Sequence, residues 1–254
     1  MTTVKDVLSY LETIAPPELK MEWDNVGLLC GSENQPVNKI LVALDPFLSV
    51  CQEAAKVGAD LIVTHHPLIF GGLQSVTDQT DSGRSILFLA EHHICAINAH
   101  TNLDCADGGV NDVLAATLGL SNIQSIEPGL LRKGTVDIQP LEQFLPKVKG
   151  SLNCAGLRFV DAGKPVHKVA VGGGSCASEL SAVVKAGCDT FVTADVKYNQ
   201  FWDAYEQGIN LIDAGHFYTE NPICQVLQDK LQSNFPEISV VISEKHTDCA
   251  NFFI

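Results

Sequence analysis

The chain has 254 residues, 46% of them hydrophobic and 18% charged, which excludes a disordered protein and allows one large α/β domain or two lobes. Its formal net charge of −14 would repel a nucleic-acid backbone or an anionic membrane surface, so neither is expected as a partner, although a small anionic substrate is still allowed. Nine cysteines without a C-x-x-C pair, no signal or transit peptide, and no apolar run near the ~18 residues of a membrane span predict a cytoplasmic protein with reduced thiols.

Short apolar runs alternate with amphipathic segments along the first half of the chain. Apolar residues recur at helical spacing over residues 4–14, and Pro16-Pro17 ends this helix. The elements expected next are a turn and short strand at 23–31, a strand at 39–44, a helix at 50–57, a strand at 61–64, a helix at 85–90, a strand at 94–98 and a helix at 110–118. This alternation is typical of an α/β fold with a mostly parallel sheet and flanking helices, in which ligands bind at the carboxyl ends of the strands.

The second half repeats this pattern. The segments at 39–44 and 56–64 align without a gap with segments that begin 129 residues later (168 − 39 and 185 − 56). We therefore expect two similar α/β lobes from an internal duplication, residues 1–125 and 126–254, with the C-terminus returning to the first lobe. The stretch 121–164 is richer in Gly, Pro and polar residues and is predicted as the connector, with short strands of its own at 134–138 and 157–160.

The most informative feature for function is the dipeptide His65-His66 at the end of the predicted strand 61–64. Imidazole is the commonest metal ligand, and two buried imidazoles without partners would be costly, so a metal role is favoured over a structural one. The second copy of the repeat has Ala194-Asp195 at the equivalent position, so the halves share a scaffold and differ in chemistry.

Three further residues complete a candidate metal site: Asp104, His216 and Glu220. Each follows a short apolar run and is expected at the same end of a sheet, although Asp104 alone could be a turn residue and Glu220 alone a solvated helix residue. Adjacent residues of an extended segment point apart, so the histidine pair would serve two neighbouring ions more easily than one. Five ligands also exceed the three or so of a catalytic zinc, and carboxylates can bridge cations, which favours a dinuclear site.

Other residues have less specific interpretations. His216 and Glu220 are four apart and would share one face of a helix. His100 could be a ligand, an orienting residue or a substrate contact, and we favour a non-ligand role as the catalytic acid or base. The run 172–175 could cradle a phosphate or form a tight turn, the latter being favoured because it lacks a P-loop ending. The segment 23–25 could line a pocket or only build a turn, and without a G-x-S-x-G motif a Ser–His–Asp hydrolase is not supported.

The chain resembles the GTP cyclohydrolase I type 2 homologue family, also known as the NGG-one-interacting-factor-like family, in its short bacterial-type form. The matching segments are residues 23–28, 64–67, 98–104 with Gly108 and Asn111, and 213–216 with Glu220. The resemblance implies a toroidal homohexamer, a trimer of dimers, with dinuclear metal sites facing an internal cavity. It also implies the ligand set His65, His66, Asp104, His216 and Glu220. Asn199 stands where the family often has histidine, so no role is carried over to that position.

Two classes of function remain open from the sequence. In the first, two divalent ions (zinc, iron, manganese or nickel) activate water to attack C8 of the guanine ring of GTP, giving formate and dihydroneopterin triphosphate. His100 would act as acid or base, and Asp104 or Glu220 would move protons if not engaged by metal. A phosphoesterase acting on a small molecule such as a nucleotide is the nearest rival. In the second, the chain stores, delivers or senses metal, or forms a ring-shaped scaffold.

Overall fold

The computed structural model describes residues 1–126, 129–251 and 253, and the chain folds into two compact units. The first unit comprises Met1–Ala106 and Cys224–Thr247, and the second comprises Asp107–Ile223 and Asp248–Ile254. These units differ from the ranges 1–125 and 126–254 expected from the sequence. The segment that follows residue 106 packs with the second sheet, whereas residues 224–247 supply the last strand of the first sheet.

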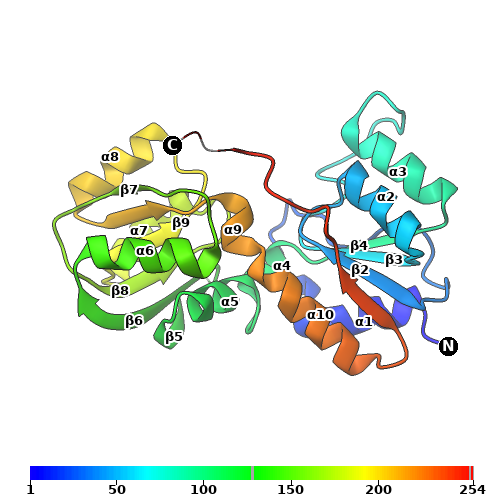
Figure 1. Cartoon of the computed structure of the whole chain (residues 1–254), viewed down its shortest axis with the longest axis horizontal. Coiled ribbons are helices and arrows are strands. Elements are labelled where there is room, and N and C mark those ends of the chain that lie inside the picture. The colour runs from blue at the N-terminus through cyan, green and yellow to red at the C-terminus, as the bar shows by residue number, and fades with distance from the viewer. Residues whose placement is uncertain (127–128, 252, 254) are drawn as a thin grey trace. The chain divides into compact units, whose positions relative to one another are not determined.

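The first unit contains a five-stranded sheet in the order β1-β4-β3-β2-β11 (Figure 1). Its strands are β1 (Gly27–Cys30), β2 (Lys39–Ala43), β3 (Leu61–Thr64), β4 (Cys95–Asn98) and β11 (Ser239–Ile242). Its helices are α1 (Val4–Ile14), η1 (Pro17–Leu19), α2 (Leu48–Val57), α3 (Asp81–Glu91), α4 (Thr101–Cys105) and most of α10 (Pro222–Asn234). Only β1 runs antiparallel to its neighbour among these strands, so this sheet is mostly parallel, as predicted.

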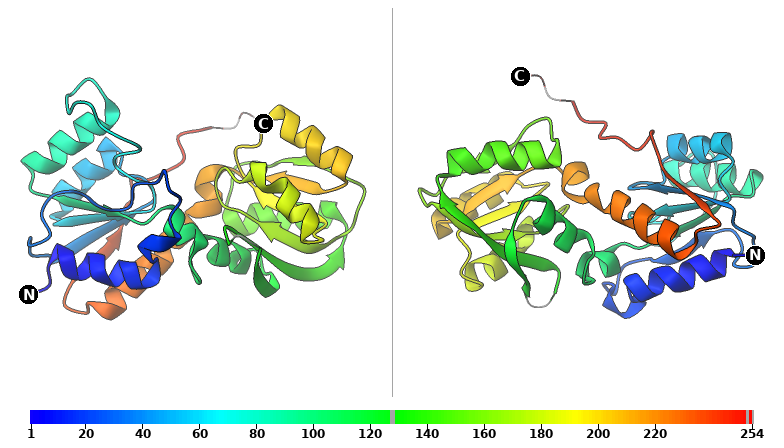
Figure 2. Two further views of the ribbon diagram at one scale, coloured as in Figure 1. Left: turned by 180° about the vertical axis from the view of Figure 1, so that it is seen from behind. Right: turned by 60° about the horizontal axis from the view of Figure 1, so that its bottom comes forward.

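Helices cover both faces of the first sheet, with α2 and α3 on one face and α1 and α10 on the other (Figures 1 and 2). On the α2 and α3 face, Cys51, Ala54 and Leu89 pack with Leu41 and Ile62 of the strands in one buried cluster. Because both faces are covered, all four residues of β3 and of β4 are buried, and these strands do not alternate between buried and exposed residues. The chain enters α1 through a capping box of Thr3 and Asp6 that satisfies the first amide groups.

The second unit contains a six-stranded sheet in the order β5-β6-β8-β9-β10-β7. Its strands are β5 (Ser121–Ile126), β6 (Leu131–Gln139), β7 (Arg158–Val160), β8 (Val166–Val171), β9 (Thr190–Thr193) and β10 (Asn210–Asp213). Its helices are α5 (Val110–Thr117), α6 (Leu141–Leu152), η2 (Ala177–Glu179), α7 (Leu180–Lys185), α8 (Tyr198–Gln207) and α9 (His216–Glu220). Side chains of α5 and α6 pack on one face of the sheet, and those of α7 and α8 on the other.

The second sheet is mixed, which corrects the expectation that both sheets are mostly parallel. Strands β8, β9 and β10 are parallel to one another. On one side of them β6 pairs antiparallel with β8, and β5 pairs antiparallel with β6; on the other side β7 pairs antiparallel with β10. The predicted connector 121–164 therefore belongs to the second unit: it provides β5, β6, α6 and β7. The strands expected at 134–138 and 157–160 lie within or overlap β6 and β7.

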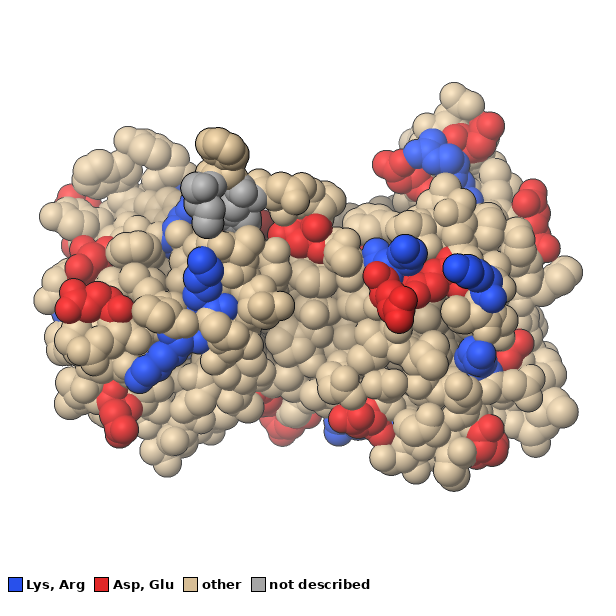
Figure 3. Space-filling model, viewed as in Figure 1, with Lys and Arg blue, Asp and Glu red and all other residues tan. Residues whose placement is uncertain are grey.

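Two surface properties bear on possible partners. Within the part of the chain that the structure describes, no helix combines the length and apolar character that crossing a bilayer requires. On the face drawn in Figure 3, both basic and acidic side chains are visible on each unit, and a short row of basic side chains lies on the unit drawn at the left.

Candidate functional site

The first group of candidate residues follows β3 and β4, which are neighbouring parallel strands whose ends pair Thr64 with Asn98. His65 and His66 leave the end of β3, and His100 leaves the end of β4. One ligating atom from each of these three imidazoles lies within 4.8 Å of the others. The three imidazoles therefore lie together at the carboxyl ends of β3 and β4, the edge of the sheet that the sequence predicts for them.

His65 is fully buried, and its ring is held in one orientation. Its Nδ1–H donates to the carbonyl of Ala99 at 2.9 Å, because a carbonyl can only accept, and this fixes the tautomer that presents Nε2 as a ligand. Nε2 lies 3.6 Å from Oδ1 of Asp104, which is on α4, one turn after His100. Imidazole and carboxylate oxygen at this spacing are suited to a common divalent cation.

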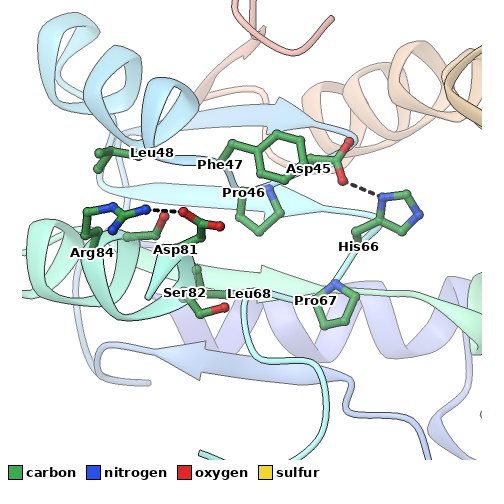
Figure 4. Close-up of a pocket in the computed structure, with 11 residues that line it drawn as sticks. Asp45, Pro46, Phe47, Leu48, His66, Pro67, Leu68, Asp81, Ser82 and Arg84 are labelled. Atoms are coloured by element: carbon green, nitrogen blue, oxygen red, sulfur yellow. Dashed lines mark hydrogen bonds and ion pairs between the residues drawn. The ribbon is translucent and has the colours of Figure 1, made fainter. Parts of the chain in front are cut away.

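His66 is oriented by a carboxylate that sequence reasoning did not identify. Its Nδ1 lies 2.7 Å from Oδ1 of Asp45, just after β2, so Nδ1–H donates and Nε2 is the nitrogen that could bind a metal ion (Figure 4). A carboxylate behind a histidine raises the basicity of the ligating nitrogen and fixes the ring. The sequence does contain one indication of this role, because Asp45 follows a predicted buried strand and is therefore expected at the same sheet edge as His66.

His100 is paired in the same way with Asp24, from the turn that precedes β1. Its Nδ1 lies 2.8 Å from Oδ1 of Asp24, and Thr101 donates its amide and hydroxyl to Oδ2 of the same carboxylate. Burial raises the pKa of Asp24, but the hydrogen bonds from His100 and Thr101 outweigh it and hold the pKa well below its ordinary value. Asp24 is thus an ionised carboxylate that fixes the His100 tautomer with Nε2 available as a base or a ligand.

The second group lies in the second unit, on the short helix α9 that follows β10. His216 and Glu220 are its first and last residues, and Nε2 of His216 lies 3.0 Å from Oε2 of Glu220. The i, i+4 spacing thus places both on one helix face, as predicted. Nδ1 of His216 is 2.7 Å from Oδ2 of Asp195, which follows β9. Asp195, the residue that orients the His216 ring, has a left-handed backbone (φ 51°). This conformation is uncommon for residues other than glycine.

The glycine run after β8 is a turn that packs against this helix. The amide of Gly172 donates to the Val192 carbonyl at 3.0 Å, that of Gly173 to Asn111 Oδ1 at 2.7 Å, and that of Gly174 to Thr219 Oγ1 at 3.0 Å. All three amide groups are engaged by protein acceptors, so the turn interpretation is supported over a phosphate cradle.

Gly174 also has a specific steric role. A Cβ at this residue would lie 2.2 Å from Oε1 of Glu220 and 2.9 Å from Nε2 of His216, and its φ of +61° suits glycine. The missing side chain therefore makes room for the two α9 ligand candidates.

A pocket of about 270 Å³ adjoins His66 in the first unit (Figure 4). Its wall near His66 is formed by Asp45, Pro46 and Pro67, and its other end by the starts of α2 and α3, with Arg84 near Asp81. A small molecule in this pocket would lie beside a candidate metal ligand.

The fold and these side chains define a class: an α/β protein whose strand ends carry imidazole and carboxylate groups able to hold metal ions. The chain belongs to the Duf34/NIF3 (NGG1p interacting factor 3) family, whose model matches residues 2–249.

Known relatives cover almost the whole chain. A Clostridium perfringens protein named GTP cyclohydrolase 1 type 2 homolog is 34% identical over 98% of this chain and 99% of its own length. A Helicobacter pylori protein named GTP cyclohydrolase 1 type 2 is 34% identical over 92% of this chain and 93% of its own. The crystal structure of a Bacillus cereus protein related to NIF3 matches with a TM-score of 0.95 and 26% identity, over 100% of this chain and 99% of that one.

Proposed function

We propose that this chain is a metal-dependent hydrolase of the GTP cyclohydrolase 1 type 2 kind, and that two divalent ions are held by His65, His66, Asp104, His216 and Glu220. The observation that carries the proposal is the cluster of three imidazoles at the ends of β3 and β4, each with its Nδ1 engaged by an acceptor. Each ring is thus held in one tautomer with Nε2 turned away from the acceptor, which supports His65 and His66 as metal ligands and His100 as a group that moves a proton.

The donor set fits divalent first-row ions, because it combines neutral imidazoles with carboxylate oxygens. Such ions, when bound, lower the pKa of water to about 7 and so supply a nucleophile at neutral pH. The ligand pair on α9 and the group at the ends of β3 and β4 would each provide both ligand types. Five ligands are the reason to propose two ions and not one.

His100 is proposed as the group that moves a proton at the substrate. Asp24 accepts from its Nδ1 and so keeps Nε2 as the atom that takes up and returns a proton. For a GTP substrate, one water would add at C8 and open the imidazole ring to a formamide, and a second water would hydrolyse the formamide to formate and an amine. The amine would then close a new ring with the rearranged ribose, with loss of one water, to give dihydroneopterin triphosphate. His100→Asn is expected to reduce turnover about 10²- to 10⁴-fold while the bound metal content is retained. A loss of metal from this variant would make His100 a ligand instead.

The direct test uses protein loaded with zinc, iron, manganese or nickel and assayed with GTP for formate and for the fluorescence of the oxidised pterin. The wild type should form both products in equal amounts, His65→Ala should form neither, and His92→Ala is the matched control because His92 is exposed and stacks on Phe88. Phosphate release without formate would replace this proposal by a phosphoesterase. Bound metal without any turnover of GTP would favour storage, delivery or a scaffold.

We also propose that the two units arose by duplication. Strands β2 and β3 pair in parallel in a register that β8 and β9 repeat 129 residues later. The carboxylate of Asp60 accepts from the amide of Lys39, and that of Asp189 accepts from the amide of Lys168 at the equivalent place. The same strand pairing and the same hydrogen bond in both units support a common origin more strongly than the two aligned sequence segments alone.

The assembly and location belong to the same proposal. The resemblance carried by the sequence motifs implies a toroidal homohexamer, a trimer of dimers, and we propose this assembly, for which light scattering should give six times the chain mass. Nine cysteines without a C-x-x-C pair are typical of a reducing compartment, and we propose the cytoplasm as the location. A smaller particle at micromolar concentration would rule out the hexamer.

A further inference from the structure

Two exposed aromatic side chains lie beside the imidazole cluster of the first unit. Trp23 is 59% exposed and Phe70 is 69% exposed, and their ring centroids are 5.6 Å apart. The centroid of His100 lies 6.1 Å from that of Trp23 and 6.2 Å from that of Phe70. Exposed aromatic side chains occur elsewhere on the chain, but these two are set apart because they adjoin the residue proposed to move protons.

The two rings are carried by segments that hydrogen bonds hold in place. The Asn25 side chain donates to the Ile69 carbonyl at 2.9 Å, which ties the turn bearing Trp23 to the loop bearing Phe70. Asn98, at the end of β4, donates to the Asn25 carbonyl at 3.0 Å. These bonds hold the segments that carry the two rings at the same sheet edge as the histidines.

The two exposed rings, called the platform below, are inclined at 48° to each other, so a planar heteroaromatic ring could stack on one ring while its edge meets the other. The faces of tryptophan and phenylalanine stack on any base, and such stacking contributes about 1–3 kcal/mol per base. Charged or aliphatic ligands would gain little from it. His100, in contact with both aromatic rings and within 5.5 Å of His66 by ring centroids, would then adjoin the edge of the stacked ring.

We infer that Trp23 and Phe70 form the stacking site for the purine ring of the substrate and set the specificity of the site for a planar nitrogen heterocycle. The inference rests on the proposed function for the identity of the ring, and it adds the residues that would bind it. The ring would be held next to His100, where a proton is needed as the ring opens.

The test measures binding and not turnover. Trp202→Phe leaves Trp23 as the single tryptophan of the chain, so its fluorescence reports on the platform. GTP and guanosine should quench it saturably, whereas ribose 5-phosphate, which lacks the ring, should not. Trp23→Leu and Phe70→Leu, followed by calorimetry, should weaken guanosine binding about 5- to 150-fold, and Trp23→Phe should retain most of the affinity.

Trp202→Leu is the matched control, because Trp202 is 52% exposed and also has an aromatic neighbour, Tyr205, at 5.9 Å between centroids. Its guanosine affinity should equal that of the wild type. Unchanged affinity in both Trp23→Leu and Phe70→Leu, or no saturable guanosine binding to the wild type, would overturn the inference. A change in oligomeric mass in Trp23→Leu with unchanged affinity would do the same, since another copy would then cover the platform.

The two proposals fail separately. Guanosine binding that depends on Trp23 without any GTP turnover would remove the hydrolase and keep the platform. GTP turnover with unaltered KM in Trp23→Leu and Phe70→Leu would keep the hydrolase and remove the platform.

Discussion

Replacing Gly174 by alanine should separate metal binding from folding in the second unit. The new Cβ would lie 2.2 Å from Oε1 of Glu220 and 2.9 Å from Nε2 of His216, both far below van der Waals contact. These atoms are the ends of side chains, so they can move at small cost in stability. Glu220 is only 4% exposed, however, and any movement takes its carboxylate away from the ligand position.

The expected magnitudes differ for the two properties. Alanine at the φ of +61° should cost about 1–2 kcal/mol in the free energy of unfolding. Gly187→Ala is the matched control, because Gly187 has a φ of +71° and its added Cβ would meet no atom within 4 Å. It should lose the same stability. The affinity for metal should fall by at least about tenfold in Gly174→Ala but not in Gly187→Ala, because a loss of this size is typical when a residue that positions a metal ligand is changed.

Urea unfolding measures the stability of both variants, and competition with a chromophoric chelator measures their affinity for zinc. Equal zinc affinity in Gly174→Ala and Gly187→Ala, with the wild type binding zinc, would refute the assignment of the α9 pair as ligands. A much larger loss of stability in Gly174→Ala would instead mean that Glu220 cannot move and that the backbone shifts.

Three further predictions test the surrounding chemistry. Asp195→Asn should keep zinc affinity within a few-fold, because an amide oxygen still accepts from His216 and asparagine tolerates the left-handed backbone, whereas Asp195→Ala should weaken it about 10- to 100-fold in the same chelator assay. Burial raises the pKa of Cys51 to about 11, so iodoacetamide at pH 8 should label exposed Cys249 first, and mass spectrometry showing equal rates would contradict this. Burial lowers the pKa of His246 below its ordinary value of 6.5, so the unfolded chain binds more protons and the free energy of unfolding should fall as the pH drops from about 7 to about 5. Urea midpoints should show a weaker pH dependence for His246→Gln.

Predicting the ends of strands from the sequence located the histidines, but it did not identify the carboxylates that orient them. His65, His66 and His100 were expected at one sheet edge because each follows an apolar run, and the structure groups them. The carboxylates of Asp24 and Asp45 were missed, since an aspartate in a turn is ordinary in sequence and gains its meaning only from the ring nitrogen that it contacts. Contacts between side chains that are distant in the sequence produce no periodic pattern, so the sequence alone could not predict them.

The elements that sequence periodicity found are the ones with a regular burial pattern, either one buried face or burial along the whole element. The helix at 4–14 and the strand at 61–64 are confirmed, because α1 has one apolar face and β3 is buried on both. Helix α6 was missed in the predicted connector: Pro146 lies inside it, and proline in a helix interior normally marks an end. The mixed second sheet was also missed, because strand direction depends on connections and not on the composition of a strand.

The two units place the same carboxylate–imidazole pair on different strands. In the first, Asp45 after β2 holds Nδ1 of His66 after β3 at 2.7 Å. In the second, the register of β8 and β9 puts Gly174 at the place of Asp45 and Asp195 at the place of His66. Asp195 then holds His216, after β10, also at 2.7 Å, and an aspartate at position 174 would occupy the space of the α9 pair. The two strand pairs thus share one register, while the carboxylate–imidazole pair of the second unit lies one strand further along. For this reason alignment to His66 alone cannot find the proposed ligands His216 and Glu220.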